Sequence, residues 1–233
     1  AGFEAVPRTV SGLDYLHAAE GVDAEDPAGG CATGLNQDGW TDLIFGRHNE
    51  SVVVFINQQD GTFREATEEY GLNGYTNISS IGAADVDNDG DTDLVLGPMR
   101  GSTFSLLIND GSGRFTNQAG SRGIDLPVTA QPHTSQSISF VDFNRAGFLD
   151  IYISEWGVPT SGEDDRHSVL LQNRGTASPG YFDNVTAAAG LQQPAIGDRH
   201  VGYSSAWVDF DQDGWPDLAK VSDLGTSQMF WND

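Results

Sequence analysis

Acidic residues at alternating positions form the most informative pattern in this sequence. Residues 85–93 read DVDNDGDTD, which puts carboxylates at positions 1, 3, 5, 7 and 9 and a glycine, Gly90, at position 6. In an extended strand these carboxylates could not meet, so the backbone must curl, and Gly90 permits the positive φ angle that a curl requires. Converging carboxylates repel one another unless a cation lies among them. An all-oxygen ligand set in a flexible loop favours Ca²⁺ over Mg²⁺.

Three further stretches repeat this pattern in the same phase. Residues 209–217 read DFDQDGWPD, with tryptophan at position 7, where only the backbone carbonyl could be a ligand. Residues 34–42 read GLNQDGWTD and lack the first acid, and residues 142–150 read DFNRAGFLD and have alanine at the central position. A solvated acidic turn explains one copy, but four copies in phase indicate metal binding. The two complete loops predict two calcium sites, and the two incomplete loops would raise the number to four.

The flanking residues distinguish these loops from other calcium motifs. An EF-hand needs a glutamate at position 12 and a helix on each side. Position 12 is Leu96 in the second loop and Lys220 in the fourth. The residues around the second loop, 80–84 before it and 94–96 after it, have the composition of β-strands. The loops are therefore predicted to join strands.

The loops recur within a longer repeat of tens of residues. Each loop is followed by two apolar segments, and the second of them ends on an asparagine, at Asn57, Asn109, Asn173 and Asn232. In three copies the asparagine is followed by a turn and an aromatic residue, and the unit then ends on Gly-Leu or Gly-Ile. Each unit is predicted to be four short antiparallel strands, with the loop joining the first to the second. The expected fold is all-β, a β-propeller-like array of four-stranded antiparallel blades, with about four blades at residues 28–72, 78–124, 136–191 and 202–233.

These features together resemble the FG-GAP/VCBS repeats. The resemblance rests on the loops, the turn NQQDGTF at residues 57–63 and the Gly71-Leu72 close, and it covers nearly the whole chain. Such repeats build calcium-binding β-propellers, including the heads of integrin α subunits and the cartilage acidic protein family. The resemblance implies that Ca²⁺ is held by side chains at positions 1, 3, 5 and 9 and by the carbonyl of position 7. The implied ligands are Asp85, Asp87, Asp89, Asp91 and Asp93; Asp209, Asp211, Asp213, Trp215 and Asp217; Asn36, Asp38, Trp40 and Asp42; and Asp142, Asn144, Phe148 and Asp150.

The charge of the chain limits its partners. Acidic residues outnumber basic ones by 34 to 11, for a formal net charge of −23, and thirteen of the acids lie in the four loops. Nucleic acids and anionic membranes are polyanions, so neither is an expected partner. No stretch approaches the ~20 apolar residues that span a bilayer. The sequence opens on AGFE, with no basic region and no apolar run. This opening predicts a processed, secreted chain in an extracellular, calcium-rich setting.

The sequence offers no arrangement typical of an enzyme. It has no Gly-x-Ser-x-Gly, no His-Glu-x-x-His and no phosphate-binding glycine-rich loop, and the acids that could transfer protons are assigned to metal. Cys31 is the only cysteine and is expected to be a small buried hydrophobe. Trp40 and Trp215 share position 7 of their loops and are expected to pack between blades.

Three functions are compatible with these features. The favoured one is a non-catalytic extracellular module for adhesion or for self-assembly into a surface structure or filament, with Ca²⁺ making each blade rigid. The second is a ligand-binding propeller segment of a larger receptor or adhesin. The third is an accessory or lectin-like domain of a secreted enzyme. Fold alone does not choose among them.

The two ends of the sequence look complementary. The fourth unit reaches only its third strand, at Met229 to Asp233, whereas Phe3 followed by Gly12-Leu13 resembles the end of a unit. Residues 1–13 are therefore predicted to be a closing fourth strand. That strand would complete the last blade either of its own chain, which closes a ring, or of another copy by head-to-tail strand addition.

Overall fold

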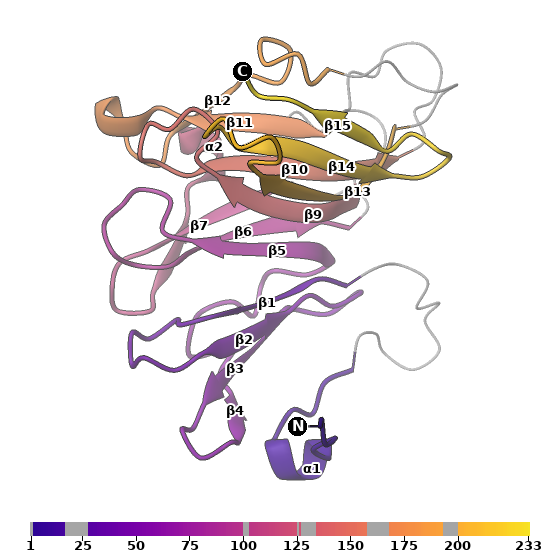
Figure 1. Cartoon of the computed structure of the whole chain (residues 1–233). Helices are drawn as coiled ribbons and strands as arrows, with labels where there is room; N and C mark the ends of the chain where they lie inside the picture. The colour runs from indigo at the N-terminus through magenta and orange to yellow at the C-terminus, as the bar shows by residue number, and fades with distance from the viewer. Residues whose placement is uncertain are drawn as a thin grey trace.

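The computed structural model describes residues 2–16, 28–99, 103–124, 126, 134–157, 168–192 and 200–233. Residues 158–167 and 193–199 of the predicted third blade and its connection to the fourth lie outside these ranges. The fold is all-β with antiparallel strands, as predicted, and it contains two one-turn α-helices and a short 3₁₀ turn at Gly175–Ala177. Four blades follow one another along the molecule from the N-terminal to the C-terminal end (Figure 1).

The first two blades are separate four-stranded sheets in which each strand pairs with the next. Apolar residues, mainly valine, leucine and isoleucine, fill β3, β6 and β7, which are buried on both faces. The order of strands in each sheet follows the order in the sequence. The strands are β1 (Gly30–Thr33), β2 (Asp42–Phe45), β3 (Val53–Asn57) and β4 (Phe63–Glu65), then β5 (Ile78–Ala84), β6 (Asp93–Pro98), β7 (Ser105–Asn109) and β8 (Phe115–Asn117).

The third and fourth blades share a seven-stranded sheet. The third has four strands and the fourth has three, and they are linked where Trp156 and Gly157 at the end of β10 pair with Val201 and His200 of β13. The strands are β9 (Thr134–Val141), β10 (Asp150–Gly157), β11 (Val169–Asn173) and β12 (Phe182–Asn184), then β13 (His200–Val208), β14 (Asp217–Ser222) and β15 (Gln228–Phe230). Among the described residues, β15 is the edge strand of this sheet on the side of the fourth blade, and β12 is the edge strand on the side of the third.

The predicted arrangement of loops and strands is confirmed. Every acidic loop joins the first strand of its blade to the second. Asn57, Asn109 and Asn173 end the third strands, whereas Asn232 lies two residues beyond β15. The strands fall within the predicted blade ranges, apart from β9 and β13, which start two residues early.

The hydrophobic core is divided into three clusters, one between each pair of consecutive blades. The first contains Leu35 and Val54 from the first blade with Leu94 and Leu107 from the second. The second cluster joins the second blade to the third, and the third cluster, which has three fully buried members, joins the third blade to the fourth. Cys31 is half-buried against the first cluster, and burial raises the pKa of its thiol to about 12. Each blade is therefore stabilised by its neighbours, as in other repeat proteins.

The N-terminal segment was predicted to be a strand, which could close the ring of its own chain. The structure does not have that strand. Residues 2–16 contain no strand, and a one-turn helix, α1 (Arg8–Ser11), occupies the middle of the segment. This segment lies beside β4 at one end of the molecule, whereas β15 lies at the other end (Figure 1). A second one-turn helix, α2 (Ala119–Arg122), follows β8. The separation of the two ends explains why the segment does not pair with β15 in its own chain.

Candidate metal centres

All four loops adopt the same curled backbone. Positions 4 and 6 have positive φ angles in each of them, and position 6 is always glycine, which tolerates this conformation without strain. The φ angles at position 4 are 56° at Gln37, 59° at Asn88, 56° at Arg145 and 66° at Gln212, and those at position 6 are 83° at Gly39, 97° at Gly90, 84° at Gly147 and 96° at Gly214. The curl predicted from Gly90 is therefore present in complete and incomplete loops alike.

The aspartate at position 9 anchors each loop to the neighbouring strand. One carboxylate oxygen accepts from the backbone N–H of position 2, and the other accepts from the N–H of the asparagine near the end of the third strand. The four residues and their two distances are Asp42 (2.9 and 2.9 Å), Asp93 (3.1 and 2.9 Å), Asp150 (3.1 and 2.7 Å) and Asp217 (2.9 and 3.0 Å). All four side chains are almost completely buried. Burial raises the pKa of Asp93 and of Asp150 to about 7, against the lowering effect of these hydrogen bonds.

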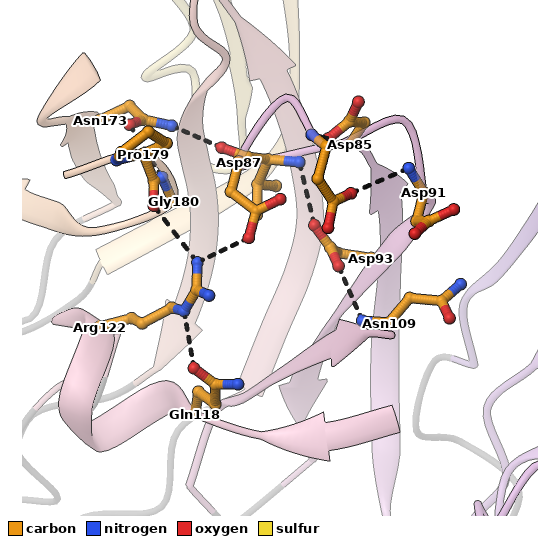
Figure 2. A network of polar contacts seen from close by, with 12 residues as sticks. Asp85, Asp87, Asp91, Asp93, Asn109, Gln118, Arg122, Asn173, Pro179 and Gly180 are labelled. Atoms are coloured by element: carbon orange, nitrogen blue, oxygen red, sulfur yellow. Dashed lines mark hydrogen bonds and ion pairs between the residues drawn. The ribbon is translucent and has the colours of Figure 1, made fainter. Parts of the chain in front are cut away.

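Three carboxylates of the second loop converge. One oxygen from each of Asp85, Asp87 and Asp89 lies within 4.8 Å of the others. Asp85 and Asp87 are labelled in Figure 2. Asp85 is held in place by the N–H groups of Asp89 and Gly90, at 3.1 and 2.9 Å. The Oδ1 atom of Asp87 is buried and has no hydrogen-bond partner. A buried carboxylate oxygen without a donor is costly, so this atom fits a metal ligand.

Arg122 from α2 supplies part of the missing positive charge. Its Nη1 lies 3.1 Å from Asp87 Oδ2, and both side chains are largely buried. Gln118 Oε1 accepts from its Nε at 2.9 Å, and its guanidinium stacks 5.0 Å from the centre of the Tyr181 ring. Burial, followed by the charge of Asp89, raises the pKa of Asp87 despite this arginine. One arginine therefore does not neutralise the cluster, which leaves room for a cation on the Oδ1 side.

Three carboxylates of the fourth loop also converge, but they come from positions 1, 3 and 9, whereas those of the second loop come from positions 1, 3 and 5. Asp209, Asp211 and Asp217 converge within 4.8 Å, so position 9 belongs to this group and Asp213 does not. Asp213 Oδ1 instead accepts from the N–H of Trp215 at 2.8 Å. The Oδ1 atom of Asp209 is buried without a donor, like that of Asp87. The N–H of Asp213 lowers the pKa of Asp211, but desolvation and the surrounding acids outweigh it and the net shift is upward.

In the first loop, hydrogen bonds stabilise the ionised form of the central acid, Asp38. The N–H of Trp40 donates to Asp38 Oδ1 at 2.8 Å and, with weaker contributions from the Asn36 and Gln59 amides, lowers the pKa of Asp38. A Cβ added to Gly34 would lie 3.5 Å from the carbonyl oxygen of Trp40, so a side chain at position 1 would face the carbonyl of position 7. Among the described residues, no group of three acids converges in this loop.

The third loop has the same curled backbone as the others but lacks acidic side chains at positions 3 and 5. Asp142 accepts from the N–H groups of Ala146 and Gly147, both at 2.8 Å, and Asn144 Oδ1 accepts from Ala146 at 3.0 Å. Phe148 offers only its backbone carbonyl, and Asp150 is the anchor already described. Within the described chain these residues do not form a converging group of three acids. Metal binding at the first and third loops stays a prediction.

Neighbouring loops touch through the residue at position 4, a feature that the sequence pattern did not reveal. Gln37 Nε2 donates to Asp91 Oδ1 of the second loop, and Asn88 Nδ2 donates to the Gly147 carbonyl of the third at 2.9 Å. The Arg145 guanidinium stacks 5.2 Å from the centre of the Trp215 ring in the fourth. Trp215 is therefore packed against the preceding blade as predicted, whereas Trp40 is 46% exposed, contrary to that prediction. Arg122 was missed as well, because nothing in its local sequence distinguishes it.

Comparison with known proteins agrees with this geometry. The sequence model of the FG-GAP-like repeat matches residues 35–96, which include the second loop and all but the first residue of the first. Cartilage acidic protein 1 of Xenopus tropicalis is 29% identical over 126 residues, 54% of this chain and 18% of that protein. The mouse and human proteins are each 29% identical over 97 residues, 41% of this chain and 14% of theirs. The resemblance to FG-GAP repeats is thus confirmed, and the chain spans less than a fifth of these relatives.

One solved structure of similar shape is a lectin of Agrocybe aegerita, reported as specific for non-reducing terminal N-acetylglucosamine. It matches with a TM-score of 0.47 and 18% identity, over 87% of this chain and 51% of the lectin chain. At that similarity the ligand of the lectin says nothing about this chain. Within the described residues no helix is long and apolar enough to cross a membrane.

Proposed function

We propose that this chain is a non-catalytic extracellular repeat module in which Ca²⁺ bound at the second and fourth loops makes the blades rigid for adhesion or assembly. The observation that carries the proposal is the pair of buried carboxylate oxygens, Asp87 Oδ1 and Asp209 Oδ1, that have no donor within clusters of converging acids. Hard oxygen ligands of this kind suit Ca²⁺. The match to FG-GAP-like repeats supports the same assignment.

Bound calcium would act on the packing between blades. The second loop carries Val86, which is fully buried in the core between the second and third blades, and its carbonyl accepts from the Asn173 side chain at 2.8 Å. Fixing this loop therefore fixes the contact with the next blade. A rigid, elongated array suits a structural role more than catalysis, and an extracellular location would supply the ion.

Calorimetric titration with Ca²⁺ tests the proposal directly. We expect two tight sites in the intact chain, one after Asp89→Asn and one after Asp209→Asn. Asp60→Asn removes the same charge from an exposed hairpin turn and should leave both sites. At a hundredfold excess of Ca²⁺ over Kd, each site would add about 2.7 kcal/mol to the free energy of unfolding. An unchanged melting curve in excess chelator, or two sites surviving in Asp89→Asn, would refute the proposal.

The length of the relatives favours one alternative. The matched part of the chain covers 18% of the amphibian protein, so a ligand-binding segment of a larger receptor or adhesin is the second candidate. Calcium would then hold a binding surface in shape. The two candidates differ in solution, because a receptor segment is expected to stay monomeric in calcium, whereas an assembling module is not.

A further inference from the structure

The two carboxylate oxygens of Asp87, at position 3 of the second loop, lie in different surroundings. Oδ1 is buried without a donor, in the group of acids that Asp87 forms with Asp85 and Asp89. Oδ2 lies 3.1 Å from Nη1 of Arg122, and the side chains of Asp87 and Arg122 are only 13% and 11% exposed. Water screens a buried ion pair less than an exposed one, so the arginine acts strongly on this carboxylate. A cation on the Oδ1 side would share the carboxylate with Arg122.

The Arg122 side chain also contacts the third blade, at the turn between β11 and β12 (residues 174–181). Its Nη1 donates to the Pro179 carbonyl at 3.4 Å, and its guanidinium carbon lies 5.0 Å from the centre of the Tyr181 ring. A Cβ added to Gly180 would lie 2.2 Å from Arg122 Nη1 and 2.8 Å from Asp87 Cβ. A side chain at this position would displace the ion pair. The pair is therefore part of the contact between the second and third blades (Figure 2).

Asn173 holds the same turn of the third blade against the second loop. Its Oδ1 accepts from the N–H groups of Gly175 and Gly180, at 3.1 and 3.2 Å. Its Nδ2 donates to the carbonyl of Val86, the residue before Asp87, at 2.8 Å. Asn173 and Arg122 thus join one turn to adjacent residues of the loop, and the arginine is the partner that carries charge.

The turns that end the first three blades can be aligned by a hydrogen bond that they share. In each turn the backbone N–H of the residue after the final glycine donates to a carbonyl five residues earlier. The donors and acceptors are Leu72 and Thr67, Ile124 and Ala119, and Leu191 and Thr186. In this alignment Tyr70 and Ala189 occupy the position of Arg122. Tyr70 also packs on the next blade, because a Cβ added to Gly113 would lie 2.9 Å from its ring.

The residue at this aligned position matches the charge at position 3 of the loop in the same blade. The pairs are Asn36 with Tyr70, Asp87 with Arg122, and Asn144 with Ala189. Packing on the next blade does not require an arginine, since Tyr70 packs there without charge. The arginine occurs in the blade whose loop has an acid at position 3. This matching indicates that Arg122 is present for the charge of Asp87.

We infer that Arg122 is the resident counter-ion of Asp87 and sets the calcium affinity of the second loop. Without Ca²⁺, the guanidinium offsets the repulsion among the converging acids and keeps the turn at residues 174–181 in contact with the loop. With Ca²⁺, two positive charges share one carboxylate and repel each other, which lowers the affinity for the ion. The loop thus gives up some affinity, and the blade contact is held in both states. The inference rests on the calcium role proposed above and adds to it a residue that regulates the site.

Calorimetric titration with Ca²⁺ of Arg122→Gln in an Asp209→Asn background, which leaves the second loop as the tight site, tests the inference. The affinity should be about tenfold higher than in Asp209→Asn alone, because a nearby positive charge is removed. Arg122→Lys keeps the charge and should leave the affinity unchanged. Arg64→Gln removes the same charge from an exposed ion pair of the first blade and should also leave it unchanged. Weaker or unchanged binding in Arg122→Gln would show that Arg122 only positions Asp87, and would overturn the inference.

Hydrogen exchange in excess chelator gives a second readout. The Gly180 N–H donates to Asn173, so its exchange rate reports whether the turn is closed against the second loop. Arg122→Tyr introduces the residue that packs at this position in the first blade. In chelator we expect faster exchange at Gly180 in this variant than in the intact chain, and Ca²⁺ should restore the protection. The amide of Val95, in the buried strand β6, is the control and should be unchanged. Equal protection of Gly180 in chelator would overturn the inference.

The titration separates this inference from the proposed function. If the Asp209→Asn chain binds no Ca²⁺, the proposed calcium role fails and the inference fails with it. If that chain binds Ca²⁺ and Arg122→Gln binds it no more tightly, the calcium role stands and only the inference is overturned.

Discussion

In the second loop (85–93) and the third loop (142–150), the first aspartate accepts the N–H groups of positions 5 and 6, at distances of 2.8–3.1 Å. The ninth aspartate is buried in both and anchors the loop to an asparagine. The loops differ at the centre, where Asp89 is replaced by Ala146 and Asp87 by Asn144. Three carboxylates converge in the second loop and not in the third.

This difference separates two roles of the acids. Positions 1 and 9 satisfy backbone donors and keep the loop folded, with or without a metal. Positions 3 and 5 of the second loop add two more carboxylates. Asp89 accepts only the N–H of Asp91, at 3.0 Å, and Asp87 is paired with Arg122, so the remaining charge favours a cation. A repeat can therefore lose its central acids and keep the folded loop, which explains how an incomplete loop persists in the array.

The largest effect is expected from removing the anchor. Asp93→Ala and Asp150→Ala each leave two backbone N–H groups without an acceptor in a buried site, at about 1–3 kcal/mol per group. In excess chelator both variants should lose about 2–5 kcal/mol of unfolding free energy, measured by denaturant titration. A cost confined to Asp93→Ala would show that position 9 is not an anchor in the third loop, and would break the comparison.

Removing the central charge should affect only calcium-dependent stability. Asp89→Ala is expected to lose about 2.7 kcal/mol relative to the intact chain at a hundredfold excess of Ca²⁺, and little in chelator. The comparison is with Ala146→Gly, which changes the same position in the third loop and should show no calcium dependence. Denaturant unfolding with and without Ca²⁺ measures both, and an equal loss for Asp89→Ala in the two conditions would contradict the assignment.

Restoring the central charge should bring the third loop closer to the second. Ala146→Asp adds a carboxylate beside Asp142 and Asn144, and ligand charge is a main determinant of calcium affinity. We expect the affinity at the third loop to rise about tenfold, or about 1.4 kcal/mol, in a calorimetric titration. Ala146→Asn is the uncharged control. No change in Ala146→Asp would mean that position 3 or the backbone limits this site.

The last effect is a pH dependence, which calcium should oppose at the second loop only. The pKa of Asp93 and of Asp150 is about 7 in the folded chain, above the ordinary value of 3.8. In chelator their contribution to stability is complete below pH 4 and is lost as the pH rises through 7, so melting temperature should fall from pH 5 to pH 8. With Ca²⁺, ionised Asp93 is stabilised, so affinity at the second loop should weaken less than tenfold between pH 7 and pH 6. A calcium affinity independent of pH would contradict this coupling.

Local pattern was sufficient to predict much of the molecule. The strands of each blade, the loop between the first and second strands and the asparagine near the end of the third follow from residues close in sequence. Gly90 and its three counterparts required a positive φ angle, and the structure has it at each of them. These features depend on backbone conformation and on alternation of apolar residues, which a short segment carries within itself.

Other features depended on how the blades pack. Asp213 lies outside the converging acids of its loop while Asp217 lies inside, and Arg122 reaches Asp87 from a helix 35 residues away in sequence. The N-terminal segment contains a helical turn against Phe63, and a cavity beside β15 joins residues of two blades. Such contacts join side chains from different repeats, and the repeat pattern in the sequence does not show which of these side chains are close together. Only the packing of one blade on the next fixes which of them meet, because the distances involved are set by side chains from both blades at once.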